Sequence, residues 1–357
     1  MQVGVWMPVY RRWVDGGAIR QLAVAAEEMG FGSIWVQDHL VAPTGGRDEQ
    51  PVEPLSSWLA PDDYGNEQFS AIEYYGESNW WLDPYVLWGF LAACTWRCEL
   101  ASDVIVIPYR DPIVQAKMLG TLDVLSGGRM VFGVGVGHVP GEFEALGVDY
   151  SRRGKLTDEY LQVMDALLQG RETSFDGPTI KFGNVLPLIE PVNGRRPPFL
   201  IGGVSKAAIR RAARLGDGWL PAHLAPENLK PGLEYLAECA AEAGRPVPAV
   251  SVAVVWGLTD PGTEQPAGRR VLRSREQITD LIGQYAELGV ERLAVDVPNP
   301  NLAVTMRQLE LLAEAAAAAG ALASPDTSGA DASAQAGSAG GAGWRHGPGR
   351  PHRQVAL

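Results

Sequence analysis

Apolar runs and amphipathic stretches alternate along most of this chain. The apolar runs are continuous, which is typical of parallel strands covered on both faces; they span residues 2–9, 33–37, 98–107, 129–135, 198–203, 216–222, 249–258 and 292–297. The stretches between them carry apolar residues at helical spacing, and several end in glycine, as helices often do. This alternation predicts an α/β protein with a (β/α)8 TIM barrel; a doubly wound open sheet is the alternative.

Two long segments interrupt the alternation. Residues 41–82 follow the second strand and are rich in Pro, Gly, acidic and aromatic residues. Connections of this length are usually functional or disordered, and the aromatic side chains favour a lid that packs over a site. We expect Trp58, Trp80 and Trp81 of this lid to contact a substrate. Residues 171–197 predict a hairpin insertion before the fifth strand.

The end of the chain has a different composition. Residues 323–357 are rich in Gly, Ala, Ser and Pro and cannot bury a core, so we predict a disordered tail. Residues 1–322 are then the barrel domain.

Composition and charge exclude several classes of partner. The 30 Lys and Arg and 42 Asp and Glu residues give a net charge of −12 without a basic stripe, so neither nucleic acid nor an anionic membrane is expected. No apolar run reaches the roughly 18 residues of a membrane span. The N-terminus enters a strand directly, without an export signal, and Cys94, Cys98 and Cys239 fit inert thiols in a reducing compartment. We therefore expect a cytoplasmic protein.

Two glycine-rich segments follow predicted strands. GVGVG (133–137) lacks the third glycine of a dinucleotide fingerprint, so a flat ring lying across the strand end is favoured, with close backbone packing as the alternative. IGGVS (201–205) leads directly into a helix, where free N–H groups can bind an anion such as a phosphate. A tight turn with Ser205 as the helix cap is compatible with that role.

Histidine is scarce, but three of the five lie at the carboxyl ends of predicted strands, where barrel active sites are found. These are His39, His138 and His223, of which His223 is a candidate substrate contact; their spacing is not that of a metal site, so no metal is expected. We interpret His39 as a ligand contact or proton donor. Asp38 is either its orienting partner or a structural cap.

Several of these segments carry a family resemblance. WVQDHL, LSGGRMVFGVGVG, EFEALGVDYSRRGKLTDEYLQVMDALLQG and PPFLIGGVSKAAIRRAARLGDGWLP resemble the bacterial luciferase-like superfamily, and within it the oxidoreductases that use the deazaflavin coenzyme F420. The resemblance covers roughly residues 1–320. It implies a TIM barrel that binds either F420 or FMN at the carboxyl ends of its strands.

The resemblance also assigns roles to individual residues. It implies a non-proline cis peptide at Asp103–Val104 beside the cofactor ring, and His39 near the reactive ring carbon. Asp103 departs from the small or neutral residue usual at its position and is a candidate for a hydrogen bond to the ring. His138 stands where a related dehydrogenase has a glutamate acid, so we treat it as a catalytic candidate. The remaining cofactor contacts implied are Gly135, Val136, Gly137, Gly202, Gly203 and Ser205.

These features favour an oxidoreductase that transfers hydride between F420 and a bulky, largely apolar organic substrate. The alternative is an FMN-dependent monooxygenase that uses reduced flavin and oxygen; a non-catalytic binding protein is a third class. A homodimer is possible by resemblance, because members of the superfamily often pair through barrel helices.

Overall fold

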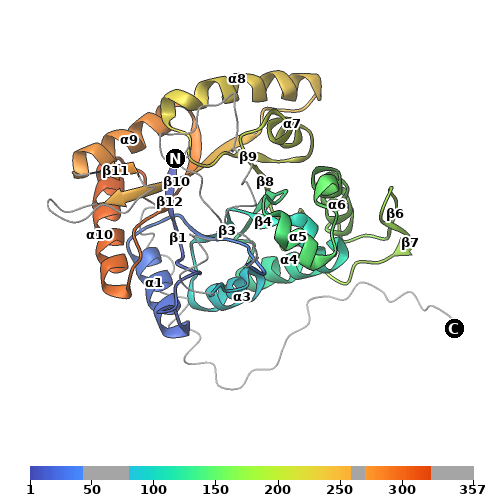
Figure 1. Ribbon diagram of the computed structural model, residues 1–357, viewed down its shortest axis with the longest axis horizontal. Coiled ribbons are helices and arrows are strands. Elements are labelled where there is room, and N and C mark those ends of the chain that lie inside the picture. Colours follow the sequence, from blue (N-terminus) through green and yellow to red (C-terminus); the bar gives the residue numbers. More distant parts are fainter. Residues whose placement is uncertain (43–79, 259–269, 273, 323–357) are drawn as a thin grey trace, which may run out of the picture. The chain divides into compact units, whose positions relative to one another are not determined.

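A computed structural model describes residues 1–42, 80–258, 270–272 and 274–322 of the chain (Figure 1). The segment with Trp58 and most of the predicted lid, 43–79, lies outside these ranges, as does the predicted tail, 323–357.

Eight parallel strands close into a barrel, as the apolar runs predict. Their order around the barrel follows the sequence, and the last strand pairs with the first through Gln2–Arg292 to Val5–Val295. The third predicted strand is interrupted, so that it forms two short pieces. The strands are β1 (Gln2–Trp6), β2 (Ser33–Val36), β3 (Glu99–Ser102) with β4 (Ile105–Val106), β5 (Met130–Gly135), β8 (Phe199–Gly202), β9 (Gly218–Leu220), β10 (Ala249–Leu258) and β12 (Val290–Asp296).

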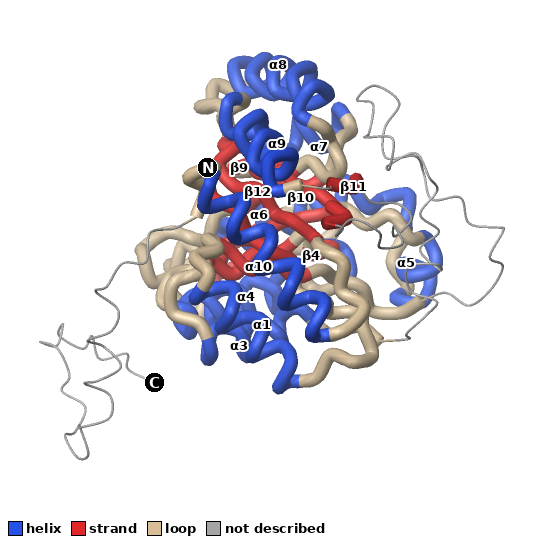
Figure 2. The backbone as a smooth tube through the Cα atoms, turned by 90° about the vertical axis from the view of Figure 1, so that its left-hand side faces the viewer, coloured by secondary structure: helices blue, strands red, loops and turns tan. Residues whose placement is uncertain are grey.

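Helices surround the strands (Figure 2). They are α1 (Gly16–Glu28), α3 (Pro84–Cys94), α4 (Pro112–Ser126), α5 (Pro140–Leu146), α6 (Arg153–Leu167), α7 (Lys206–Leu215), α8 (Pro226–Glu242), α9 (Arg275–Glu287) and α10 (Leu302–Ala318), with the 3-10 turns η1 (Ile107–Tyr109) and η2 (Tyr150–Arg152). Two of these helices, α3 and α4, begin with an Asp-Pro pair. Asp83 accepts hydrogen bonds from the first N–H groups of α3, and Asp111 from those of α4.

The predicted hairpin insertion is present. β6 (Thr173–Asp176) pairs antiparallel with β7 (Lys181–Val185) before β8. A short strand that the sequence pattern did not indicate, β11 (Arg270–Leu272), adds to β10 in parallel.

The barrel interior is filled from every strand. One buried side chain from each of the eight strands forms an inner cluster: Trp6, Trp35, Ala101, Val131, Leu200, Leu220, Ala253 and Ala294. Beneath this cluster, at the amino ends of the strands, Arg292 donates two hydrogen bonds of 2.7 and 2.9 Å to Glu99, which also accepts one of 2.6 Å from Gln2. The amino end of the barrel is therefore closed by polar side chains, and only the carboxyl end is left for a ligand.

Glycine is required where β5 passes β3. A Cβ at Gly133 would overlap the carbonyl oxygen of Ser102, whose hydroxyl also bonds the backbone N–H and C=O of Gly133 at 3.0 Å. Backbone atoms at this contact cannot move aside as a side chain could.

We expect Gly133→Ala to lower the free energy of unfolding by about 3 kcal/mol, at the upper end of overpacking effects. The control is Gly183→Ala in β7, where a Cβ would meet nothing within 4 Å. Denaturant unfolding of both variants measures the difference; equal stabilities would contradict this account of the β3–β5 contact.

Candidate active site

The carboxyl ends of the strands bring the predicted site residues to one face of the barrel. Asp38 and His39 lie two and three residues after β2, His138 follows β5 and His223 follows β9. His223 has a left-handed backbone (φ 59°) and donates its N–H to the carbonyl of Ala253, which fixes the end of β9 against β10.

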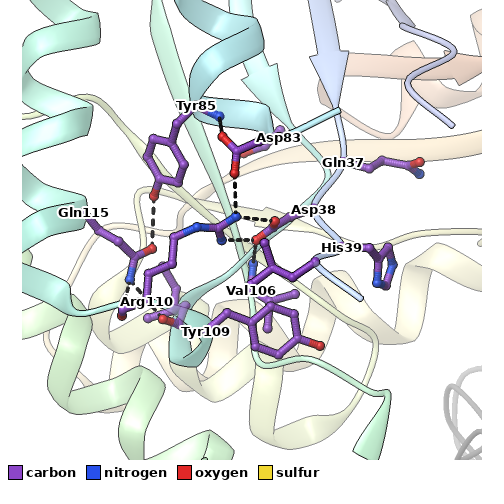
Figure 3. Close-up of polar contacts among 12 residues, drawn as sticks. Gln37, Asp38, His39, Asp83, Tyr85, Val106, Tyr109, Arg110 and Gln115 are labelled. Carbon is purple, nitrogen blue, oxygen red and sulfur yellow. Dashed lines mark hydrogen bonds and ion pairs between the residues drawn. The ribbon is translucent and has the colours of Figure 1, made fainter. Parts of the chain in front are cut away.

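The carboxylate of Asp38 forms an ion pair with the guanidinium of Arg110. This buried carboxylate accepts hydrogen bonds of 2.6 and 2.8 Å from the two terminal nitrogens of Arg110 and one of 3.0 Å from the N–H of Val106 (Figure 3). Arg110 also donates to Asp83, the cap of α3. Burial opposes the charge on Arg110, but the bonds to Asp38 outweigh it and raise the guanidinium pKa above its usual value. The pair ties the end of β2 to β4 and to the start of α3.

His39 points the other way. Figure 3 shows Gln37 and His39 on the side of the strand opposite to the carboxylate of Asp38, as alternation along an extended chain requires. The Nδ1 atom of His39 lies 2.8 Å from Oε2 of Glu142, in α5. The residue bonded to the His39 ring is thus Glu142, whereas the carboxylate of Asp38 bonds Arg110 and Val106.

Glu142 is completely buried and anionic. It accepts hydrogen bonds from the Tyr109 hydroxyl (2.7 Å) and the N–H of Leu40 (2.9 Å) in addition to the imidazole. Burial alone would raise the pKa of Glu142, but the hydrogen bonds and the nearby His39 lower it below its usual value. A carboxylate here makes Nδ1 of His39 the donor. The other ring nitrogen, Nε2, is then the atom through which the imidazole can exchange a proton.

Aromatic rings flank His39 on two sides. Trp81 lies edge-on at 4.8 Å between ring centroids and His138 at 5.9 Å. Trp81 also stacks on Tyr10 and donates to the carbonyl of Gln37, so its position is fixed. His138 is exposed, although the protein around it lowers its pKa to about 4, chiefly by desolvation. The lowered pKa favours the neutral form of His138 at pH 7.

The peptide between Asp103 and Val104 is cis, at the position that the resemblance implies. Val104 packs against the inner cluster, and its side chain occupies the space that a Cβ at Gly135 or Gly202 would need. Because these two glycines have no side chain, the side chain of Val104 fits against β5 and β8.

The glycines beyond β5 and β8 have left-handed backbones, with φ of 81° at Gly137 and 110° at Gly203. Gly137 is separated from Gly135 by the half-buried Val136. Ser205 caps α7 by accepting from the N–H of Ala208 at 3.2 Å, as the turn interpretation requires. The start of a helix directs backbone N–H groups outward, an arrangement that suits an anion.

The other predicted contacts are placed as follows. Trp80 is 44% exposed, whereas Trp81 is half-buried beside His39. In the described ranges no group of three or more His, Cys, Asp or Glu side chains could hold a metal ion. No helix in the described part of the chain is both long and apolar enough to cross a membrane.

Sequence reasoning missed Glu142, Tyr109 and Arg110. An acid in the first turn of a helix is common because it complements the helix dipole, so Glu142 carries no signal of its own. Arg110 precedes an Asp-Pro helix start and resembles a surface residue. Both pair with residues far away in the sequence, and local patterns do not show such pairs.

Comparisons with known proteins agree on the family and divide on the cofactor. A model of luciferase-like monooxygenases matches residues 1–271. An uncharacterized protein of Mycobacterium tuberculosis is 29% identical over 288 residues, covering 81% of this chain and 90% of the relative.

Three solved structures share the fold at low identity, and each is covered to 97% or more by the match, which spans 88% of this chain. Monooxygenase RslO1 from Streptomyces bottropensis has a TM-score of 0.69 at 19% identity. An F420-dependent secondary alcohol dehydrogenase, in complex with an F420-acetone adduct, has a TM-score of 0.67 at 16%. The oxygenating constituent of 3,6-diketocamphane monooxygenase from Pseudomonas putida, in complex with FMN, has a TM-score of 0.64 at 16%.

Breaking the buried ion pair of Asp38 and Arg110 should destabilise the folded protein. We expect Arg110→Met to lower the free energy of unfolding by about 3–5 kcal/mol, because Asp38 would remain buried without its cation. Arg307→Met removes an exposed pair with Glu310 and should cost less than about 1 kcal/mol. Chemical denaturation compares the two; similar losses would show that the Asp38–Arg110 pair is not a structural tie.

The carboxyl of Asp103 should make stability depend on pH. None of the described residues donates a hydrogen bond to it, and desolvation raises its pKa from 3.8 to about 7. Since the folded-state value lies above the unfolded one, its contribution to stability is full below pH 3.8 and is lost as the pH rises through about 7.

Asp103→Asn removes this titration, so the variant should gain stability relative to the wild type between pH 5 and about pH 8. Asp280→Asn, at an exposed position of α9, is the control and should show no such gain. Urea unfolding at pH 5 and at about pH 8 measures the free energy of unfolding of each protein. If the difference between Asp103→Asn and the wild type is the same at both pH values, the prediction is wrong.

Proposed function

The chain belongs to the luciferase-like monooxygenase family, and within it we propose that the protein transfers hydride between the deazaflavin coenzyme F420 and a bulky, largely apolar organic substrate. The observation that carries the proposal is the His39–Glu142 pair at the carboxyl end of the barrel. A positioned imidazole with a buried anionic partner suits transfer of a proton to or from the substrate oxygen, which accompanies hydride transfer to or from the adjoining carbon. The similarity to an F420-dependent alcohol dehydrogenase supports this reading.

The residues present fit a flat cofactor with a phosphate. Gly137 and Gly203, which follow β5 and β8 and have no side chain, would let a flat ring lie against backbone at the carboxyl end of the barrel. Asp103, Val104 and residues 135–137 would hold the ring, and Gly202, Gly203 and Ser205 would hold the phosphate at the start of α7. When bound, F420 supplies or accepts the hydride.

The chain's own residues would then perform the proton chemistry. In the direction of carbonyl reduction, Nε2 of His39 gives a proton to the substrate oxygen; in the direction of alcohol oxidation it takes one. Glu142 stabilises the charged imidazolium in either direction and holds the ring in place. Trp81 and His138 flank the imidazole, and the half-buried indole of Trp81 favours an apolar substrate group.

An FMN-dependent monooxygenase is the second candidate. It is favoured by the similarity to monooxygenase RslO1 and to the FMN-bound monooxygenase of Pseudomonas putida. The two functions differ in their co-substrate, since only the monooxygenase consumes oxygen.

Cofactor titration separates these candidates. With eleven tryptophans in the chain, a bound ring should quench the intrinsic fluorescence. We expect F420 to bind at micromolar concentration and FMN at least about tenfold more weakly, a difference of about 1.4 kcal/mol. The reverse preference, with oxygen consumption, would favour the monooxygenase. If the protein binds neither F420 nor FMN, the proposed cofactor site is wrong.

Removing the imidazole should reduce turnover rather than cofactor binding. We expect His39→Ala to lower kcat about 100-fold or more, as for loss of a general acid–base, and to change the Kd for F420 less than about threefold. Glu142→Gln should lower kcat in the same assay, because the amide cannot stabilise an imidazolium. His346→Ala is the matched control and should retain wild-type kcat. An unchanged kcat in His39→Ala would exclude the proposed proton transfer.

A further inference from the structure

Two polar groups at neighbouring strand ends are buried without a hydrogen-bond partner. They are the indole N–H of Trp6, at the end of β1, and the side-chain oxygen of Gln37, directly after β2. Trp6 is only 6% exposed. Other buried indoles in the described part of the chain are paired: Trp35 donates to Ser33, Trp88 to Ala101 and Trp219 to Gly203. The unpaired Trp6 is therefore an exception that calls for a cause.

Both groups face the inside of the barrel at its carboxyl end. β1 and β2 are adjacent, with Trp6 opposite Trp35, and both tryptophans belong to the inner cluster. Gln37 is two residues beyond Trp35 and so extends from the same side of the strand. Figure 3 shows Gln37 on the same side as His39 and opposite to the carboxylate of Asp38. The backbone at Gln37 is fixed by the indole of Trp81, which donates to its carbonyl at 3.3 Å.

The types of these groups indicate what they bind. A side-chain amide presents an acceptor and a donor side by side, and an indole presents a donor. An amide is complementary to an N–H that lies beside a C=O, and a further donor is complementary to a second C=O. A ring edge in which one N–H lies between two carbonyls offers this pattern.

We propose that the amide of Gln37 and the indole N–H of Trp6 recognise the imide edge of the cofactor ring, where an N–H lies between two carbonyls. This inference rests on the proposed function. The edge is common to FMN and F420, so Gln37 and Trp6 recognise either ring and do not select between them. The bound ring edge satisfies groups that are otherwise buried unpaired, and it is anchored on the strand that also carries His39.

The test compares two glutamines that are both buried with an unpaired side-chain oxygen. Gln37→Met removes the amide at the barrel mouth, and the control Gln308→Met removes the one in α10. Fluorescence titrations use F420 and FMN, each also as its N3-methyl derivative. We expect Gln37→Met to weaken binding of the preferred cofactor at least tenfold and Trp6→Phe at least threefold, whereas Gln308→Met stays within twofold of the wild type.

The methylated ligands identify the edge. The wild type should bind the unmethylated form at least tenfold more tightly, and Gln37→Met should lose most of this discrimination. Without ligand, the Tm of Gln37→Met should equal or exceed that of the wild type, because an unpaired buried polar group is removed. A lower Tm with unchanged affinity would instead assign Gln37 a structural role and overturn the proposal.

Failure of this inference is distinguishable from failure of the proposed function. If the wild type binds a cofactor and Gln37→Met binds it equally well with the same discrimination, the imide-edge assignment is wrong and the function stands. If the wild type binds neither F420 nor FMN, both the imide-edge assignment and the proposed function are wrong.

Discussion

Two hydrogen bonds of 2.6 and 2.8 Å join the guanidinium of Arg110 to the carboxylate of Asp38, whose side chain has no accessible surface. This pair fixes the direction in which the chain leaves β2. Because successive side chains of an extended strand point to opposite sides, holding Asp38 on the helix side places Gln37 and His39 on the barrel side. The same guanidinium bonds Asp83, so the start of α3 is set by the interaction that positions the site.

The strand and helix elements were predictable because each depends on a local pattern. The eight barrel strands are continuous apolar runs, and the Asp-Pro pairs at Asp83 and Asp111 cap α3 and α4 by bonds to N–H groups two and three residues away. The hairpin insertion follows from a break in the strand–helix alternation. The third strand was expected to be continuous, and its interruption at the cis peptide followed only from the resemblance.

The site itself was predictable only in part. The position of His39 at a strand end indicates the barrel mouth, but its partner Glu142 is 103 residues away and Arg110 is 72 residues from Asp38. A carboxylate that stabilises a distant imidazole resembles, in sequence, one that complements a helix dipole. The unpaired state of Trp6 and Gln37 depends on what surrounds each side chain in three dimensions, and no sequence pattern reports it.

Two buried carboxylates, Asp38 and Glu142, flank the end of β2, and they differ in the groups that compensate their charge. Arg110 is charged at every physiological pH, so Asp38 has a permanent counterion. Glu142 is compensated by a hydroxyl, a backbone N–H and an imidazole, and of these three only the imidazole can carry a positive charge. A proton gained by His39 is therefore met by an existing anion in a buried setting, where that interaction is stronger than in water. One acid at the end of β2 is thus paired with a permanent cation, and the other with the imidazole to which we assign proton transfer.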